Sequence, residues 1–326
     1  MDIKVTRNSP LIRVLADQVQ NKNVETDKVE EANEIISELL KEPNKNNLEI
    51  VANTIAYTIT DLQQHELDFL NQIADQKQIN WGEQAAFKIK NNNGLRAVFQ
   101  ARGATTPRSY VGESQIVVTT EELSIRPAIN IMDLRTNRVN MADLIRQANR
   151  EMTLAKIAKV EQTLHDSIGD GRYESPFFGH GTGIVKSIID QQIQYFRGIG
   201  PVTLLGDIAA VGLLANVPGV QMSNNMMDEY NDNGFLGRYI GCNILTLQNA
   251  YRDGETTPIL ANNWIYIMPA GMTPDSKNLK IVTEGNVEAF EATDINDKTL
   301  NIRLDQDFGV AFVTAHNPTM GAYCIN

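Results

Sequence analysis

One long helix limits what this chain can become. The stretch NMADLIRQANREMTLAKIAKVEQTLHDSIGDG, Asn140 to Gly171, carries small or apolar residues mostly at spacings of three or four, and GDG ends the run. Asn140 can cap the first turn, and Asp143 places a carboxylate near the positive end of the helix dipole. At 1.5 Å per residue the helix from Asn140 to Ile168 spans roughly 43 Å, well above the usual length. Something elongated must therefore lie against it.

The composition is that of a folded chain with room for two or three domains. It has 326 residues, of which 42% are hydrophobic. No window approaches ~18 consecutive apolar residues, and the start MDIKVTRNSP lacks the apolar region of a signal peptide, so we expect a protein made and kept in a cytoplasm, without membrane contact. Two cysteines, Cys242 and Cys324, provide neither a disulfide framework nor a Cys-rich zinc site, and we expect both to be buried apolar residues.

Charge is distributed unevenly along the chain. The formal net charge of -11 argues against a protein whose main task is gripping nucleic acid. Residues 21–80 hold 12 acidic residues against 5 lysines, whereas residues 81–120 hold 2 glutamates against 5 basic residues. An acidic region is thus followed by a basic one.

The first 80 residues read as helical. Ser9 and Pro10 predict a helix start. ETDKVEEANEIISELLKE predicts an amphipathic helix that stops at Pro43, and a third helical run covers about 47–75, broken near Gln64. Two interpretations stay open for this acidic region: a small helical subdomain with a solvated charged face, or an arm that docks on another subunit.

From Trp81 the period changes to that of strands. AAFKIK and LRAVFQAR both alternate, and NNNG at 91–94 between them is a strong turn signal, so we predict a β-hairpin. Its apolar set is thin, and a two-stranded hairpin is weakly stable alone. It should therefore rest on another part of the structure.

The remainder mixes strands and helices. SQIVVTTEELSIRPAINIMDL predicts an extended β segment before the long helix, and residues 171–290 read as a compact α/β domain with a helix near 184–196. That domain should include the strand LKIVTEG. The alternating C-terminal strands could return to pair with the segment before the long helix, which would build one domain from separated pieces of chain.

No constellation of residues favours an enzyme. The four histidines, at 65, 165, 180 and 316, lie far apart without metal-ligand spacing. GHGTG at Gly179–Gly183 precedes a helix but lacks the lysine of a phosphate-binding loop. We therefore interpret it as a flexible connection rather than a phosphate cradle. Glu121 and Glu122, adjacent in a β segment near Arg126, point to opposite faces and predict salt bridges at a strand edge. We expect no catalytic residue, cofactor or metal.

Four stretches in order resemble the major capsid proteins of tailed bacteriophages, whose Hong Kong 97-type (HK-97) fold is shared with encapsulin shells. They are TTEELSIRPAINIMDLRTNRVNMADLIRQANREM, GFLGRYIGCNILTL, the pair IYIMPAG and IVTEG, and DFGVAFVTAHNPTMGAYC. The resemblance covers about Trp81 to Asn326 and implies an α+β, HK-97-like capsid fold in which the long helix is the spine of the peripheral domain. The implied divisions are a helical N-terminal arm (1–80), an extended E-loop hairpin (81–120), a peripheral domain (121–170 and 291–326) and an α/β axial domain (171–290).

The same resemblance implies a function. A major capsid protein self-assembles through pentamers and hexamers into an icosahedral shell around a double-stranded DNA phage genome, in the host cytoplasm. Scaffold, portal and decoration proteins are its implied partners, and packaged DNA is touched only non-specifically. Two other readings stay open: an encapsulin-like shell around an enzyme cargo, and a cytoplasmic α/β enzyme with an unrecognised site. We expect a retained N-terminal arm rather than an uncleaved precursor. Covalent cross-links from an E-loop lysine occur in the family, but neither Lys88 nor Lys90 can be matched to that lysine, so the resemblance implies nothing about a cross-link here.

Charge suggests where subunits meet. We hypothesise that the basic hairpin docks on an acidic surface of the next subunit, because opposite charges orient a contact made by thin extensions. The basic residues are Lys88, Lys90, Arg96 and Arg102, and the acidic surface includes Glu30, Glu31, Glu34 and Glu38.

Overall fold

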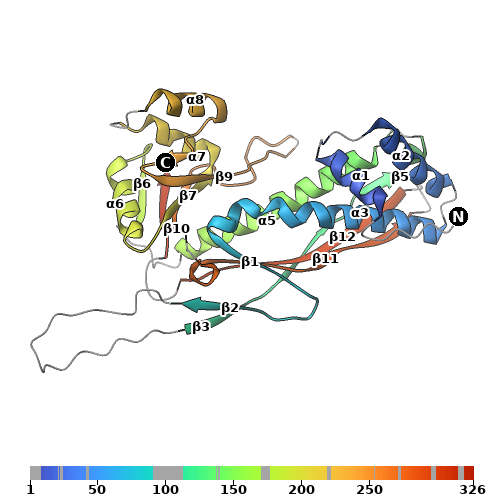
Figure 1. The fold of residues 1–326 in the computed structure, drawn as a ribbon, viewed down its shortest axis with the longest axis horizontal. Coiled ribbons are helices and arrows are strands. Elements are labelled where there is room, and N and C mark those ends of the chain that lie inside the picture. The colour runs from blue at the N-terminus through green and yellow to red at the C-terminus, as the bar shows by residue number, and fades with distance from the viewer. Residues whose placement is uncertain are drawn as a thin grey trace, which may run out of the picture.

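The computed structural model describes residues 9–326 apart from 21, 23–24, 42–43, 91–112, 137, 139, 170–176, 219–221, 253, 271–272, 295–298 and 315–318. The molecule is elongated, with the N-terminal helices at one end of the long axis and the smaller α/β unit at the other (Figure 1). Separate layers of helix and sheet confirm the expected α+β class.

Helices cluster in three parts of the chain. The N-terminal group consists of α1 (Pro10–Val19), α2 (Thr26–Lys41), α3 (Lys45–Glu66) and the short η1 (Asp68–Gln72). The short α4 (Ile131–Arg135) precedes the long α5 (Met141–Gly169). The α/β unit holds α6 (Lys186–Arg197), α7 (Ile208–Gly212), η2 (Leu213–Asn216) and α8 (Asn224–Asn233). The short η3 (Pro274–Ser276) precedes residue 279, where a strand of the other sheet begins.

The long helix is confirmed with its predicted cap. Asn140 Oδ1 accepts a hydrogen bond from the backbone N–H of Ala142 at 3.0 Å. The first half of α5, from Met141 to Met152, packs in one hydrophobic core, and the second half, from Ile157 to Leu164, packs in another. Two successive cores explain why the helix needs its length.

A five-stranded sheet forms the body of the molecule. Its order is β1-β11-β12-β4, with β5 also paired to β12; β1 and β11 are parallel and the other pairs antiparallel. The strands are β1 (Ala74–Ile79), β4 (Glu121–Ile125), β5 (Ala128–Asn130), β11 (Leu279–Thr293) and β12 (Thr299–Phe312). The pairing of β12 with β4 and β5 confirms that C-terminal strands return to the segment before the long helix.

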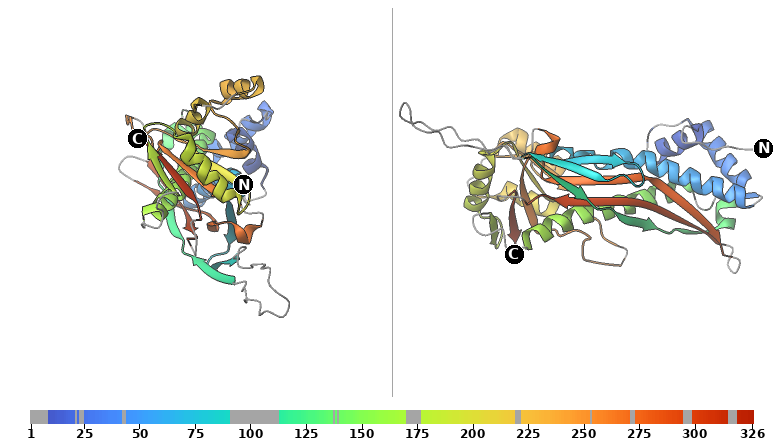
Figure 2. Two further views of the ribbon diagram at one scale, coloured as in Figure 1. Left: turned by 90° about the vertical axis from the view of Figure 1, so that its left-hand side faces the viewer. Right: turned by 90° about the horizontal axis from the view of Figure 1, so that it is seen from below.

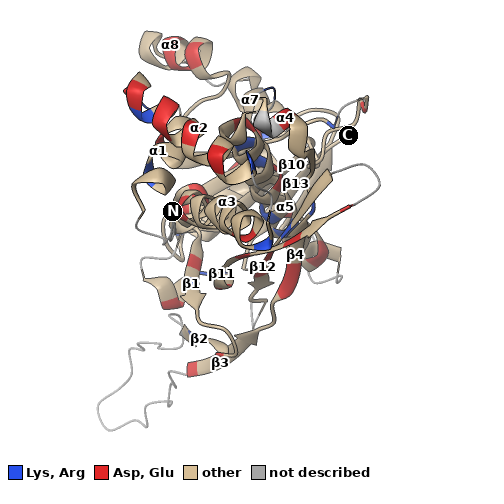
Figure 3. Cartoon of the chain, turned by 90° about the vertical axis from the view of Figure 1, so that its right-hand side faces the viewer, with Lys and Arg blue, Asp and Glu red and all other residues tan. Residues whose placement is uncertain are grey.

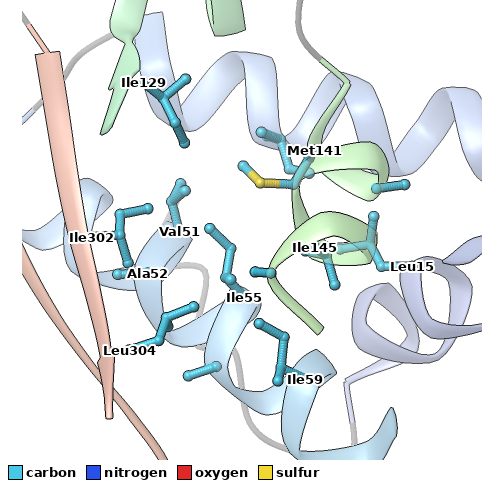
Figure 4. Packing of buried hydrophobic residues seen from close by; sticks show 14 of the residues in the cluster. Leu15, Val51, Ala52, Ile55, Ile59, Ile129, Met141, Ile145, Ile302 and Leu304 are labelled. Carbon is cyan, nitrogen blue, oxygen red and sulfur yellow. The ribbon is translucent and has the colours of Figure 1, made fainter. Parts of the chain in front are cut away.

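The N-terminal helices share a core with this sheet rather than forming a unit of their own. Residues from α1, α2 and α3 pack with the first half of α5 and with β12 (Figure 4). Ile55 and Ile145 are fully buried there, and Leu304 of β12 closes the cluster from the sheet side. The predicted third helical run is too long: α3 ends at Glu66, and the segment after η1 is strand β1.

A six-stranded sheet organises the α/β unit. Its order is β6-β13-β10-β7-β9-β8. Its strands are β6 (Phe178–Gly181), β7 (Val202–Asp207), β8 (Arg238–Tyr239), β9 (Cys242–Leu247), β10 (Trp264–Pro269) and β13 (Gly321–Ile325). Residues that alternate along β7 face different cores, because Leu204 packs with α6 and α7 while Leu205 packs with the second half of α5.

Two strands belong to sheets other than those expected. β11, which includes LKIVTEG, lies in the five-stranded sheet although residues up to 290 were assigned to the axial domain, and β13 lies in the six-stranded sheet although residues 291–326 were assigned to the peripheral domain. The physical reason is pairing: β11 hydrogen-bonds along nearly its whole length with β12, while β13 completes the sheet between β6 and β10. We therefore propose an axial unit of 177–269 and 320–326 and a peripheral unit that includes β11 and β12.

The hairpin strand β2 has a partner that was not predicted. β2 (Ala85–Lys90) is antiparallel to β3 (Glu113–Val118), with Phe87 opposite Ile116, and the predicted partner LRAVFQAR lies outside the described residues. The predicted turn at 91–94 and the rest of residues 91–112 lie outside the described residues. The pair projects from the sheet face opposite α5 (Figure 2).

Candidate assembly interfaces

The base of the hairpin is part of the folded body. Phe87 is fully buried and packs with Ala85, Val118 and Val282, the last of which comes from β11. Along β11, Ile281 faces the helices and Val282 faces the hairpin, as the two-residue period of a strand requires. The sheet is thus covered on both faces at this point, and the hairpin base has a fixed seat.

A buried ion pair lies beneath the hairpin base. Lys280 Nζ is 3.0 Å from Asp75 Oδ2, and the two side chains are 0% and 8% exposed. The same ammonium donates to the carbonyl of Pro274 at 3.0 Å and lies 5.4 Å from the centre of the Phe87 ring. Lys77, which donates to the carbonyl of Ala86, lies 4.3 Å from that ring centre. Two cations therefore face one aromatic ring, a favourable arrangement for its quadrupole.

Glu284 binds both the segment that leads into the hairpin and the segment that leaves it. One carboxylate oxygen accepts from the backbone N–H of Gly82 at 2.8 Å, and the other accepts from the Thr120 hydroxyl at 2.8 Å. The next residue, Gly285, has a φ of +66°, and a side chain there would collide with the indole of Trp81. Glycine is required at this position by backbone conformation and by space.

The predicted basic residues are placed only in part. Lys88 is exposed on β2 opposite Gln115, and Lys90 stands opposite Glu113 in the strand register. Arg96 and Arg102 lie outside the described residues. The structure therefore places Lys88 and Lys90 at the C-terminal end of β2, in a pair of strands whose base is packed against the sheet.

The predicted acidic residues form an exposed face of α2. Glu30, Glu31, Glu34 and Glu38 are all exposed, and Ala32, Ile36, Leu39 and Leu40 are buried on the other side of the helix. None of the four carboxylates forms an ion pair with another residue in the described part of the chain. Acidic positions follow α2 in Figure 3. Figure 1 shows α2 among the helices at one end of the molecule and the β2–β3 pair below the sheet, away from α2, so the structure keeps β2 and α2 apart within one chain.

Sequence reasoning missed a buried polar network where α3, α5 and β12 meet. Lys156 of α5 is 3% exposed and donates to Gln63 Oε1 at 2.6 Å and to Gln306 Oε1 at 2.7 Å. Gln63 in turn donates to Asn149 and Thr153 of α5. Burial lowers the pKa of the Lys156 ammonium to about 8 because the charged form is desolvated. The network fixes the register of the spine helix against its two neighbours.

This buried lysine predicts a dependence of stability on pH. The unfolded chain keeps the Lys156 proton up to its ordinary pKa of 10.5, while the folded chain releases it near 8, so stability rises with pH between these values. Each pH unit is worth about 1.4 kcal/mol, and the free energy of unfolding of the native protein should therefore gain up to about 3 kcal/mol relative to Lys156→Met across this window. Urea unfolding of both proteins at several pH values measures the gain.

The matched control removes a surface lysine from the same helix. Lys159 of α5 pairs with Glu121 at 2.8 Å, and Lys159→Met tests for any general effect of losing a lysine. The quantity to follow is the free energy of unfolding of the native protein minus that of Lys156→Met. If it does not increase from pH 8 upward, the assignment is contradicted.

GHGTG is a packed segment rather than the predicted flexible connection. Gly179 lies in β6, where a side chain would collide with Ile188 and with the ring of Tyr323. The Tyr323 hydroxyl donates to the carbonyl of Gly183 at 2.7 Å and accepts from the N–H of Val185 at 3.0 Å. The glycines thus give the tyrosine room to hold the strand against the start of α6.

The cysteines and the Glu121–Glu122 pair, which could have carried chemistry, have structural surroundings. Cys242 is buried and Cys324 is half-buried, and both are free. Glu121 pairs with Lys159 and Glu122 with Arg303, which confirms salt bridges at this strand, although the partners differ from Arg126. Within the described residues, no three His, Cys, Asp or Glu side chains gather as metal ligands, and no helix there has both the length and the hydropathy to cross a bilayer.

Solved structures similar to this chain include phage and virus-like particles. The mature capsid of bacteriophage PhiM1 is 11% identical with a TM-score of 0.47, over 78% of this chain and 86% of that one. Microbacterium phage Oxtober96 is 11% identical with a TM-score of 0.49, over 77% and 89%. A virus-like particle from Pyrococcus furiosus is 11% identical with a TM-score of 0.44, over 81% and 96%. No curated protein matches the sequence.

A family model matches nearly the whole sequence. The match runs over residues 4–324, which includes the N-terminal helices, the hairpin, the spine helix and both sheets. The model describes the "SPbeta prophage-derived putative capsid protein YonB". The resemblance to phage capsid proteins is thereby confirmed at the level of the family, and the chain belongs to the YonB family of prophage-derived capsid proteins.

Proposed function

We propose that this protein is the major capsid protein of a tailed phage or prophage, and that it self-assembles through pentamers and hexamers into an icosahedral shell around double-stranded DNA. The observation that carries the proposal is the family match over residues 4–324. The encapsulin-like cargo shell is the less favoured alternative because the family is described as a capsid protein. An enzyme with an unrecognised site finds no support in the geometry of the described residues.

The shape and charges of the molecule suit this role. A shell subunit needs many moderate contacts, each of which buries roughly 1,000 Å² or more, rather than one deep pocket. An elongated body with a seated pair of strands below its sheet and an acidic helix near one end offers two complementary surfaces. Complementary surfaces at different places on a subunit form a heterologous contact that repeats from copy to copy and closes into a ring when the rotation allows.

We place the hairpin contact on the neighbour's α2. The basic residues Lys88, Lys90, Arg96 and Arg102 meet the acidic face made by Glu30, Glu31, Glu34 and Glu38 of the next copy. Separation of β2 from α2 within one chain supports a contact between copies. Electrostatic attraction of this kind selects the partner and speeds association more than it adds affinity, and salt screens it.

Electron microscopy of the purified protein, expressed alone, tests the proposed function. We expect closed shells or five- and six-membered rings by negative stain, with a megadalton mass by light scattering. A uniform small oligomer at high concentration would contradict the proposal. Shells that contain a co-purified enzyme and no nucleic acid, when isolated from the native host, would favour the cargo compartment instead.

Charge reversal tests the hairpin contact. Lys88→Glu with Lys90→Glu should suppress assembly at low salt, because like charges placed opposite each other cost several kcal/mol. Adding Glu34→Lys and Glu38→Lys should restore assembly by exchanging the two signs. Light scattering against salt concentration gives the readout, and Arg13→Glu with Lys45→Glu, two exposed cations elsewhere, is the matched control. Unchanged assembly and salt dependence of the hairpin variant would refute the contact.

The remaining partners follow from the proposed role. Scaffold, portal and decoration proteins would contact the shell, and packaged DNA would touch it only non-specifically, which agrees with a net charge of -11. We place assembly in the host cytoplasm and the finished protein in the virion capsid.

A further inference from the structure

The turn between β8 and β9 has an unusual residue at its tip. Ile240 has a φ of +47° and Gly241 a φ of +73°, so both central residues of this two-residue hairpin are left-handed. Such turns favour Asn, Asp or Gly at the first position, and a β-branched residue there is an outlier. The chain therefore accepts strain to keep isoleucine at this point.

Its surroundings hold the turn in this conformation. Tyr239 and Cys242 on either side are each 1% exposed and pair with one another across the hairpin. The Tyr239 hydroxyl donates to Asp190 Oδ1 of α6 at 3.2 Å. The Arg197 guanidinium donates to the carbonyl of Ile240, and a side chain at Gly241 would collide with that guanidinium. The tip is thus fixed before any partner arrives.

The fixed tip presents an apolar side chain to solvent. Ile240 is 43% exposed, and Ile199, two residues beyond Arg197, is 41% exposed. Beside the turn lies an open hollow of about 340 Å³, with an apolar wall of Pro201, Val202 and Ala270. The rest of its lining is Gly241 and the polar residues Gln72, Arg197, Thr203 and Asn243. A projecting apolar residue and a hollow with an apolar wall thus lie on one surface.

We propose that Ile240 anchors a contact between two copies of this chain by entering the hollow of a neighbouring copy. The inference rests on the proposed function, which requires self-association. A second copy is the fitting occupant because this one surface carries both complementary parts. Residues that dominate an interface are typically rigid apolar side chains that fill a pocket. A side chain that is already fixed in the free subunit loses little conformational entropy on binding.

Ile240→Asn separates strain from contact. Asparagine tolerates the left-handed conformation, so the melting temperature of the unassembled subunit should rise by about 2–4 °C. The protein concentration needed for assembly should nevertheless rise about tenfold or more, because the apolar anchor is lost. Differential scanning fluorimetry at low concentration and light scattering at increasing concentration measure the two effects.

Two further variants define the controls. Ile240→Val keeps a β-branched apolar side chain and should leave both quantities close to native values. Ala270→Glu places a charge in the hollow and should raise the assembly concentration without raising the melting temperature. If the native protein assembles and Ile240→Asn does so at the same concentration, the contact is refuted while the capsid function stands. A lower melting temperature for Ile240→Asn would refute the strain argument, and failure of the native protein to assemble would overturn both proposals.

Discussion

Replacing Asp75 by leucine is expected to lower the free energy of unfolding by about 3–5 kcal/mol, because it leaves the buried ammonium of Lys280 without a counter-charge. Lys280 is 0% exposed and, among the described residues, would retain the carbonyl of Pro274 as its one hydrogen-bond acceptor. The loss should centre on the join between β1 and β11, where Asp75 stands opposite Lys280 in the parallel register. Urea unfolding followed by circular dichroism provides the measurement.

The double variant Asp75→Leu with Lys280→Met is the decisive control. Replacing both partners of a buried ion pair by apolar residues of similar volume is often neutral or stabilising. We therefore expect the double variant to recover most of the stability lost in Asp75→Leu. Equal losses in the single and double variants would show that packing, and not the unpaired charge, sets the cost.

The second large effect is expected from Phe87→Ala, at about 3–5 kcal/mol. Phe87 fills the space between the hairpin base and β11, and its ring faces the cations of Lys77 and Lys280. Truncation leaves a cavity beneath a two-stranded element that has little other support. The substitution should also accelerate amide hydrogen exchange in β2 and β3 more than it accelerates exchange in α5.

Two substitutions test whether this loss comes from the buried ring. Phe87→Leu preserves much of the volume and should cost clearly less than the alanine variant. Val117→Ala changes a residue on the paired strand that is 51% exposed, and its effect should stay within about 0.5 kcal/mol. An alanine variant as stable as Val117→Ala would mean that the hairpin base does not belong to the cooperative core.

The long helix could be predicted because its signals are local. The cap at Asn140, the apolar spacing and the terminating glycines all lie within the helix or next to it. Strand β1 could not be predicted in the same way. Its sequence ADQKQI is polar, and it becomes a strand only because it pairs with β11, some 200 residues later in the chain.

The pairing of β2 with β3 was missed for a related reason. NNNG is a strong turn signal, and the alternating stretch that follows it is a plausible strand on local grounds. That stretch lies outside the described residues; in the structure β2 pairs with Glu113–Val118, and Phe87 packs against Val282 of β11. Contacts with residues so distant in sequence decide the register, and a single sequence does not display them.

The candidate interfaces were partly accessible from sequence. Exposure of the acidic face of α2 follows from its amphipathic pattern, and the structure agrees with it. Lys156 and Lys280 were missed because lysine is almost never fully buried unless it is paired, and their partners come from other elements. Ile240 was also missed, since only the backbone conformation shows that isoleucine is out of place there.

The position of β13 sets the order in which the molecule can be completed during synthesis. This strand lies between β6 and β10, and its residues Ala322 and Tyr323 contribute to the cores on opposite faces of the six-stranded sheet. Until 321–325 have left the ribosome, β10 lacks one neighbour and Tyr323 cannot fix the start of α6. The six-stranded sheet is therefore completed only when 321–325 pair between β6 and β10, after its five other strands have been synthesised.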